Sequence, residues 1–76
     1  MDANASRITG EVLRELREVA GLTQSQVGEL LGVYQSRISN IENGERTLHA
    51  HEIPEYAKAL GVSSYDLLSA IETALS

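Results

Sequence analysis

Apolar residues recur at helical spacing in five stretches of the chain, separated by polar residues and glycines. The first stretch, residues 6–20, carries Ile8, Val12, Leu16 and Val19 three or four positions apart, which predicts an apolar face on a helix. The other four stretches cover residues 24–31, 35–43, 51–60 and 64–75. No stretch alternates with the period of a strand, so the pattern predicts an all-α fold of five short helices.

Glycine, proline and capping residues place the ends of these helices. Gly21 follows the first stretch at the position of a left-handed C-cap, and Thr23 with Gln26 has the spacing of a capping box. Pro54 must lie in a first turn, because only there does its missing N–H cost no hydrogen bond. Gly10 interrupts the first helix at a cost of about 1 kcal/mol relative to alanine, so we expect another helix to approach it closely.

Residues 24–43 have the spacing of a helix-turn-helix, in which a short turn joins two helices. Gly28 is the fifth residue of this unit and is expected where the two helices cross with little clearance. Gly32 is the ninth and is expected in the turn with a positive φ, which glycine adopts without strain. Five apolar residues are expected to fix the angle between the helices: Val27, Leu31, Val33, Ile38 and Ile41.

The composition is that of one small domain and excludes several kinds of site. We expect a single domain over residues 1–76, and a chain of this size is marginally stable alone, which favours association. The absence of cysteine excludes disulfides, thiolate zinc sites and thiol nucleophiles. No apolar run is long enough to span a membrane, and the N-terminus lacks a signal-peptide core, so we expect a cytoplasmic protein with no membrane partner.

The overall charge is acidic, whereas nucleic-acid binders usually present a basic surface. Six basic and eleven acidic residues give a formal charge of −5. The excess is uneven, because residues 1–20 and 21–47 carry −1 each and residues 48–76 carry −3. A DNA-binding surface within residues 21–47 would depend on neutral hydrogen-bond donors more than on ionic phosphate contacts.

Four short motifs stand out in the sequence: GLTQ at residues 21–24, LLGV at 30–33, IENGE at 41–45 and ALGV at 59–62. Together with Pro54 and Glu55, they resemble the Xre/Cro-type helix-turn-helix family of phage repressors and bacterial regulators, over residues 8–70. The resemblance implies a compact five-helix, lambda-repressor-like domain that places its third helix in the major groove of double-stranded DNA, usually as a homodimer. It also implies a transcriptional regulator, which we expect to be a repressor.

The resemblance assigns DNA contacts to positions of this sequence. Four residues of the third helix match base-reading positions or lie between them: Gln35, Ser36, Arg37 and Asn40. Five residues match or adjoin positions that contact phosphates: Thr23, Gln24, Tyr34, Asn43 and Arg46. The residue types suit these roles, since amides pair with adenine, arginine pairs with guanine or phosphate, and a helix N-terminus binds phosphate. The family's buried ion pair matches Arg17 and Glu42, which we expect to be structural.

Other interpretations of these residues stay open. The polar side chains of the third helix would equally suit a solvated surface, and Arg37 would also pair with a nearby acid. Tyr34 stands where the family most often has a capping serine or threonine, so a cap worth about 1 kcal/mol is lost. Its ring is expected either against DNA or in a packing contact. The loop after Gly44 is poorer in lysine and arginine than that of many relatives.

The last predicted helix, about residues 64–75, has more apolar surface than one core contact requires. We expect four of its residues to form a symmetric dimer interface: Leu67, Leu68, Ile71 and Leu75. In such a dimer, the two third helices would address half-sites about 34 Å apart on a roughly palindromic operator.

The sequence shows no pattern of catalytic or metal-binding residues. Its Ser, His and Asp residues lack the spacing of a hydrolase and it has no glycine-rich phosphate loop, so we expect neither an enzyme nor a cofactor. A solvated loop suits His49 and His51 better than a metal site does. The alternative function is a protein-interaction module of the same fold, such as an antitoxin or anti-repressor, which the acidic, apolar C-terminal segment favours.

Overall fold

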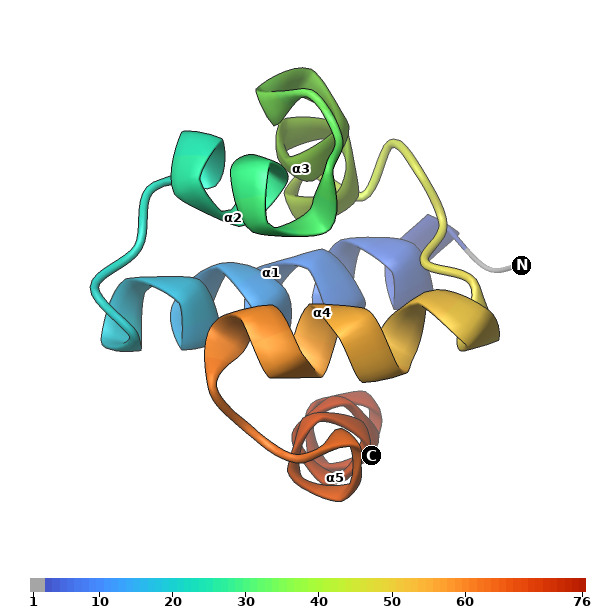
Figure 1. Ribbon diagram of the computed structural model, residues 1–76. Coiled ribbons are helices and arrows are strands. Elements are labelled where there is room, and N and C mark those ends of the chain that lie inside the picture. The colour runs from blue at the N-terminus through green and yellow to red at the C-terminus, as the bar shows by residue number, and fades with distance from the viewer. Residues whose placement is uncertain (1–2) are drawn as a thin grey trace.

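A computed structural model describes residues 3–76 and contains five α-helices and one short 3₁₀ turn within them (Figure 1). The elements are α1 (Ala3–Val19), α2 (Gln24–Leu31), α3 (Gln35–Glu42), the 3₁₀ turn η1 (Ala50–Glu52), α4 (Ile53–Leu60) and α5 (Ser64–Leu75). No strand occurs among these residues, and the predicted all-α fold of five helices is confirmed.

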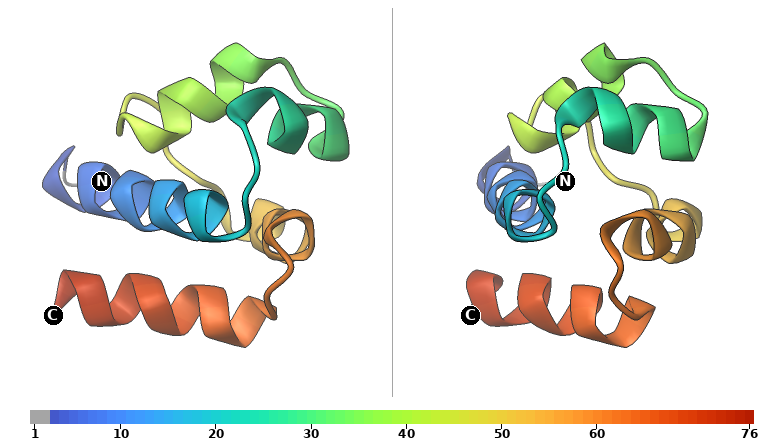
Figure 2. Two further views of the ribbon diagram at one scale, coloured as in Figure 1. Left: turned by 90° about the vertical axis from the view of Figure 1, so that its left-hand side faces the viewer. Right: turned by 60° about the vertical axis from the view of Figure 1, so that its left-hand side comes forward.

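The helices are stacked in three levels. α2 and α3 lie on one side of a middle level formed by α1 and α4, and α5 lies on the other side (Figure 1 and Figure 2). α1 contacts both α3 and α5, and α4 contacts both α2 and α5. The middle level therefore supports the helix-turn-helix from below, and the outer surfaces of α2 and α3 stay open.

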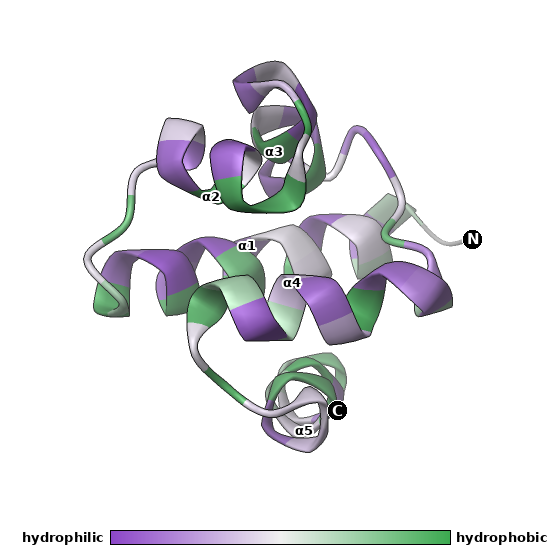
Figure 3. Cartoon of the chain, in the orientation of Figure 1, coloured by the Kyte–Doolittle hydropathy of each residue, from purple (hydrophilic) through white to green (hydrophobic). Residues whose placement is uncertain are grey.

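Apolar side chains from all five helices meet in one core. Its buried members are Leu13, Val27, Ile38, Ile41, Tyr56, Ala57, Leu60 and Leu67. Figure 3 shows hydrophobic residues on the side of α2 that faces the middle level and hydrophilic residues on its outer turns. Burial of these side chains is the main term that holds α2 and α3 in place.

The buried face of α1 is centred differently from the prediction. Leu13 is fully buried, whereas Val19 is exposed and does not belong to the core. Gly10 and Arg17 lie on the same side of α1 as Leu13, and a hydrophobic pattern counts neither of them. The pattern therefore identified the edge of this face rather than its centre.

Gly10 lies where α1 and α3 approach each other closely. A Cβ built at Gly10 would overlap the main-chain carbonyl oxygens of Ile41 and Glu42 at the end of α3. The prediction that another helix approaches Gly10 is confirmed. The close approach also brings the Glu42 side chain against α1.

The helix ends largely follow the predicted signals. Gly21 has a φ of 75°, which confirms the left-handed cap after α1. Pro54 occupies the first turn of α4 as predicted. Two starts differ, because α1 begins at Ala3 rather than at residue 6, and His51 lies in η1 rather than at the start of α4.

Candidate nucleic-acid interface

The turn between α2 and α3 is built on two glycines. Gly32 has a φ of 70° and ends α2, as predicted, and the Val33 N–H then donates a 2.9 Å hydrogen bond to the Gly28 carbonyl. A Cβ at Gly28 would lie 2.8 Å from the Val33 carbonyl oxygen. Little clearance at Gly28 is confirmed, but the neighbour is the backbone of the turn rather than the crossing of the two helices.

The starts of α2 and α3 are capped differently. At α2, the Thr23 hydroxyl accepts a hydrogen bond from the Gln26 N–H at 3.1 Å, and the Gln26 side chain accepts one from the Thr23 N–H at 2.8 Å. This is the predicted capping box. At α3, Tyr34 makes no side-chain capping bond, and its residue exposure is 87%. The structure gives the Tyr34 ring no packing role.

α3 presents polar side chains outward and apolar side chains inward. Gln35, Ser36 and Asn40 are exposed, whereas Ile38 and Ile41 are buried in the core. The two isoleucines anchor α3 on the middle level. The exposed side is a row of hydrogen-bonding groups on a rigid helix.

Two surface hollows lie on adjacent sides of α3. The first hollow is lined by Arg14, Arg17, Thr23, Gln24, Ser25, Gln35 and Asn43. The second hollow is lined by Gly32, Val33, Tyr34, Ser36, Arg37, Asn40 and Arg46. All nine residues predicted to contact DNA line one hollow or the other.

Arg14 and Ser25 line the first hollow and were missed by the sequence reasoning. Arg14 lies one helical turn before Arg17, and its only ion pair among the described residues is a 3.7 Å contact with Glu18. Ser25 lies in the first turn of α2 and is exposed. The spacing of Arg14 from Arg17 was the available signal, because residues three apart share a helix face.

A buried ion pair joins α1 to the end of α3 beside the first hollow. Arg17 Nε lies 2.7 Å from Glu42 Oε2 and Arg17 Nη2 lies 3.1 Å from Glu42 Oε1, with side-chain exposures of only 11% and 1%. Arg17 Nη1 also donates to the Leu22 carbonyl at 2.7 Å. The Glu42 hydrogen bond raises the pKa of Arg17, so Arg17 stays protonated in this expected pair.

Hydrogen bonds connect this ion pair to two of the residues predicted to contact DNA. Gln24 Nε2 donates to Glu42 Oε1 at 3.0 Å, and Gln35 Nε2 donates to Gln24 Oε1 at 2.8 Å. A carboxylate only accepts hydrogen bonds, so Glu42 fixes the direction of the Gln24 amide, and Gln24 in turn fixes that of Gln35. Gln35 Oε1 makes no hydrogen bond within residues 3–76 and remains open to a partner.

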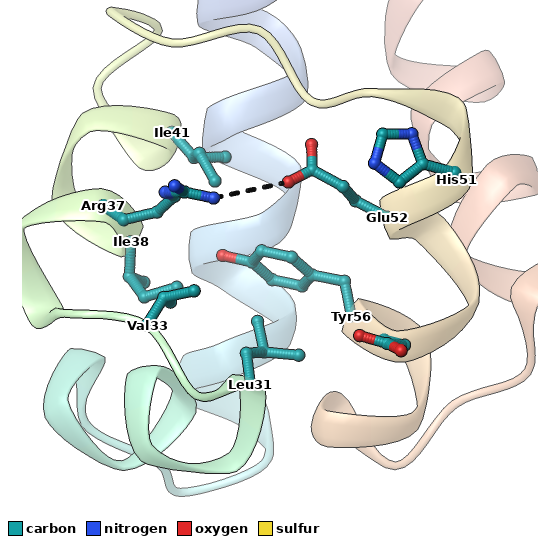
Figure 4. Close-up of a pocket in the computed structure, with 9 residues that line it drawn as sticks. Leu31, Val33, Arg37, Ile38, Ile41, His51, Glu52 and Tyr56 are labelled. Carbon is teal, nitrogen blue, oxygen red and sulfur yellow. Dashed lines mark ion pairs between the residues drawn. The ribbon is translucent and has the colours of Figure 1, made fainter.

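A second acidic residue holds the cations of the second hollow. Arg46 Nη1 and Nη2 each lie 3.2 Å from one oxygen of Glu52, and Arg37 Nη1 lies 3.8 Å from Glu52 Oε2. The alternative that Arg37 pairs with a nearby acid therefore describes this structure. Figure 4 shows the Arg37–Glu52 pair spanning a cavity between α3 and α4, into which the Tyr56 hydroxyl points.

The two histidines stack on each other near this cavity. The ring centroids of His49 and His51 are 5.8 Å apart. Among residues 3–76, no group of three His, Cys, Asp or Glu side chains could hold a metal ion. No helix in this part of the chain is long and apolar enough to cross a membrane.

The apolar surface of α5 is partly different from the predicted dimer interface. Leu67 is 0% exposed and belongs to the core, so its assignment to an interface is wrong. Ile71 is partly buried and packs against the core. Leu68 and Leu75 are exposed, and Tyr65, which the prediction omitted, is exposed beside them on one stripe of α5.

Comparisons with known proteins agree with this geometry. A family model described as a helix-turn-helix domain matches residues 9–73. The chain is 41% identical over 66 residues to the protein named "Putative antitoxin HigA2" of Mycobacterium tuberculosis, covering 80% of this chain and 65% of that protein. The chain therefore spans just under two thirds of that relative's length.

Two solved structures have closely similar folds. An Xre-family-like protein of Pseudomonas syringae pv. tomato superposes with a TM-score of 0.80 at 33% identity, covering 96% of this chain and 89% of the other. The restriction-modification controller C.Esp1396I, solved as a tetramer with its natural 35-base-pair operator, has a TM-score of 0.83 at 21% identity over 93% of both chains.

At 21% identity, the likeness to the controller shows the fold alone. The family model and the relatives of 33% and 41% identity show the family. The matched residues 9–73 contain the capped α2, the glycine turn and α3. The chain thus belongs to the Xre-type helix-turn-helix family of transcriptional regulators and has its lambda-repressor-like fold.

Proposed function

We propose that this chain binds double-stranded DNA as a homodimer and represses transcription from a roughly palindromic operator. The observation that carries this proposal is the grouping of all nine predicted contact residues in two hollows beside α3. α3 is held by its buried isoleucines and exposes only polar side chains between the hollows. Such a helix suits the major groove, which is wide enough to admit it.

In this proposal, the exposed residues of α3 contact the bases. The oriented amide of Gln35 offers a free Oε1 and one remaining Nε2 hydrogen, which match the donor and acceptor on the major-groove edge of adenine. Asn40 has the same pair of groups, and Arg37 matches guanine. Ser36 lies beside them and can pair with several bases.

Phosphate contacts fall to the residues that flank α3. Thr23 and Gln24 lie at the start of α2, where open backbone N–H groups and the helix dipole favour an anion. Asn43 lines the first hollow together with Thr23 and Gln24, whereas Tyr34 and Arg46 line the second hollow and would contact the neighbouring phosphates. The same fold holds an operator in the C.Esp1396I tetramer, which supports DNA as the partner here.

Dimerisation is assigned to the exposed stripe of α5. Tyr65, Leu68 and Leu75 are apolar and exposed, and burying such a stripe against a second copy is favourable. A two-fold dimer would present two α3 helices to half-sites about 34 Å apart. Action on DNA implies a cytoplasmic location, with no cofactor required.

Selection of bound duplexes from a random library tests the proposal. We expect enrichment of an inverted repeat with half-sites about one helical turn apart. Enrichment of a single unrepeated site would contradict the dimer, and no enrichment at low salt would contradict DNA binding. Reporter expression with and without the protein then tests repression.

A second candidate function is neutralisation of a partner protein, in the manner of an antitoxin. The similarity to the HigA2 protein favours it, as does the charge of −3 on residues 48–76. A salt titration with random duplex separates the two functions. Affinity that falls with salt supports DNA binding, whereas undetectable binding at every salt concentration favours a protein partner.

A further inference from the structure

Glu52 faces the two arginines of the second hollow with one carboxylate. It pairs with Arg46 through both oxygens at 3.2 Å. It also pairs with Arg37 at 3.8 Å (Figure 4). Both arginines are predicted DNA contacts, one for a base and one for a phosphate. A guanidinium group held on a carboxylate must leave it, or share it, in order to bind DNA.

Glu52 is the stationary member of this cluster. The His49 N–H donates a 2.8 Å hydrogen bond to Glu52 Oε1, which closes the 3₁₀ turn and ties the carboxylate to the backbone. The side chain of Glu52 is 20% exposed, compared with 28% for Arg46 and 44% for Arg37. The two arginines have the longer and more exposed side chains, so they are the members able to exchange partners.

Glu52 is ionised at neutral pH. Its partial burial raises the pKa. The hydrogen bonds from the His49 N–H and from Arg46 lower the pKa by more than that, so the net shift is downward. At neutral pH a charged carboxylate therefore offsets the positive charge with which Arg37 and Arg46 would otherwise attract phosphate.

The importance of Glu52 follows from how few arginines line the two hollows. Four arginines line the hollows: Arg14, Arg17, Arg37 and Arg46. Arg17 is committed to the buried carboxylate of Glu42. Of the remaining three, two are held by Glu52, so one residue controls most of the positive charge that the surface can offer to DNA.

We propose that Glu52 is a positioning residue that competes with DNA for Arg37 and Arg46 and thereby limits affinity for every duplex, whatever its sequence. This inference rests on the proposed DNA binding. Because the arginines must exchange partners, the ionic part of binding is weakened. The neutral donors of the first hollow are unaffected, since they lie on the Glu42 network.

The matched test compares Glu52→Gln with Glu55→Gln. Glutamine at position 52 keeps the acceptor for the His49 N–H but loses the charge that holds the arginines. Glu55 lies one turn along in α4 and lines the same cavity, but it forms no ion pair among the described residues. Both variants change the net charge by one, so a difference between them reports on the arginine contacts.

For Glu52→Gln we expect affinity for a random duplex to rise roughly three- to tenfold at low salt, the range for losing two partly exposed ion pairs. The slope of log affinity against log salt should become more negative by about 0.9, the value for one phosphate contact, because only Arg46 of the two arginines is assigned to a phosphate. Glu55→Gln should change both quantities by less than half as much. In an Arg46→Ala background, the effect of Glu52→Gln should shrink.

Equal effects of the two variants, or unchanged binding by Glu52→Gln, would overturn the inference while leaving DNA binding in place. Failure of the parent and both variants to bind any duplex would instead remove the proposed function itself. Should Glu52→Gln fail to fold, NMR of the arginine Nε–Hε groups in the parent decides the matter. Added duplex must shift the Arg37 and Arg46 signals, and unshifted signals would overturn the inference.

Discussion

Two carboxylates hold arginines on either side of α3, and they differ chiefly in burial. Glu42 and Arg17 are almost completely enclosed and bonded through two contacts of 2.7 and 3.1 Å. The cluster of Glu52 with Arg46 and Arg37 is partly exposed, with contacts of 3.2 to 3.8 Å. The same pair of chemical groups therefore forms a fixed structural connection at one site, whereas at the other site we propose an exchangeable contact.

This difference extends to the two hollows. In the first hollow, the Glu42 network already orients the neutral amides of Gln24 and Gln35. In the second hollow, the proposed DNA contacts require Arg37 and Arg46 to leave Glu52 or to share it. We therefore expect Gln35 in the first hollow to contribute sequence preference with little salt dependence, and Arg37 and Arg46 in the second hollow to contribute the ionic part of the affinity.

The largest expected effect comes from breaking the buried pair. Arg17→Met leaves the Glu42 carboxylate buried without its partner, which should lower the free energy of unfolding by about 3–5 kcal/mol. Urea unfolding followed by circular dichroism measures it. The control Arg14→Met removes an exposed arginine one turn away and should change stability by less than about 0.5 kcal/mol. Similar losses in both variants would show that burial does not distinguish these arginines.

The close approach of α1 and α3 at Gly10 brings Glu42 against α1, where it pairs with Arg17. Gly10→Ala should cost about 1–3 kcal/mol, because the added methyl group overlaps two carbonyl oxygens of α3 and forces the helices apart. The comparison variant Gly21→Ala meets no atom within 4 Å, and only its positive φ opposes it, at about 1–2 kcal/mol. Thermal unfolding gives both values. A neutral Gly10→Ala would show that α1 and α3 can move apart at no cost in stability.

Removing an oriented amide tests the first hollow. Gln35→Ala should weaken operator binding by about 1–3 kcal/mol and relax the preference at one base position. Its salt slope should stay that of the parent, because no ionic contact is lost. Binding titrations on the selected operator and on single-base variants measure both. A uniform loss on all sequences would mean that Gln35 does not read a base.

In the proposed dimer, the exposed stripe of α5 forms the interface that presents both hollows twice. Leu68→Glu should raise the dimer dissociation constant by about tenfold or more, because the new charge is desolvated in the interface. Thr73→Glu places the same charge on another exposed side of α5 and should leave the dimer intact. Sedimentation equilibrium distinguishes them. Unchanged association of Leu68→Glu would assign the dimer to another surface.

The smallest expected effect belongs to the second hollow. Arg46→Ala should weaken binding to all duplexes similarly and make the salt slope shallower by about 0.9 or less, since part of this contact is already offset by Glu52. Fluorescence anisotropy over a range of salt concentrations measures the slope. A loss confined to one operator sequence would move Arg46 into the base-reading group.

Much of the fold was predictable because its signals are local. The capping box of Thr23 and Gln26 and the left-handed Gly21 and Gly32 depend on neighbouring residues, and the structure confirms them. The face of α1 was less predictable, because Gly10 and Arg17 occupy its centre for reasons that arise from α3. Hydrophobic periodicity does not identify a glycine that is needed for close packing or an arginine that is needed for a buried ion pair.

The candidate site divides in the same way. The nine contact positions were assigned from the resemblance, and folding brings them together around α3. Leu67 was misassigned because the two sides of an apolar helix look alike until a core covers one of them. Glu52 was overlooked because its partners Arg37 and Arg46 are distant from it in sequence or lie across a loop.

The sequence by itself determined the helical order, the glycine turn and the polar character of α3, since each follows from contacts between near neighbours in the chain. Only the tertiary structure decided which carboxylate each arginine meets and how deeply the pair is enclosed. Those outcomes depend on where α1, α3 and α4 come to lie against one another. Burial removes water from the charged groups. A dehydrated pair stays together, whereas a hydrated pair can exchange its partner.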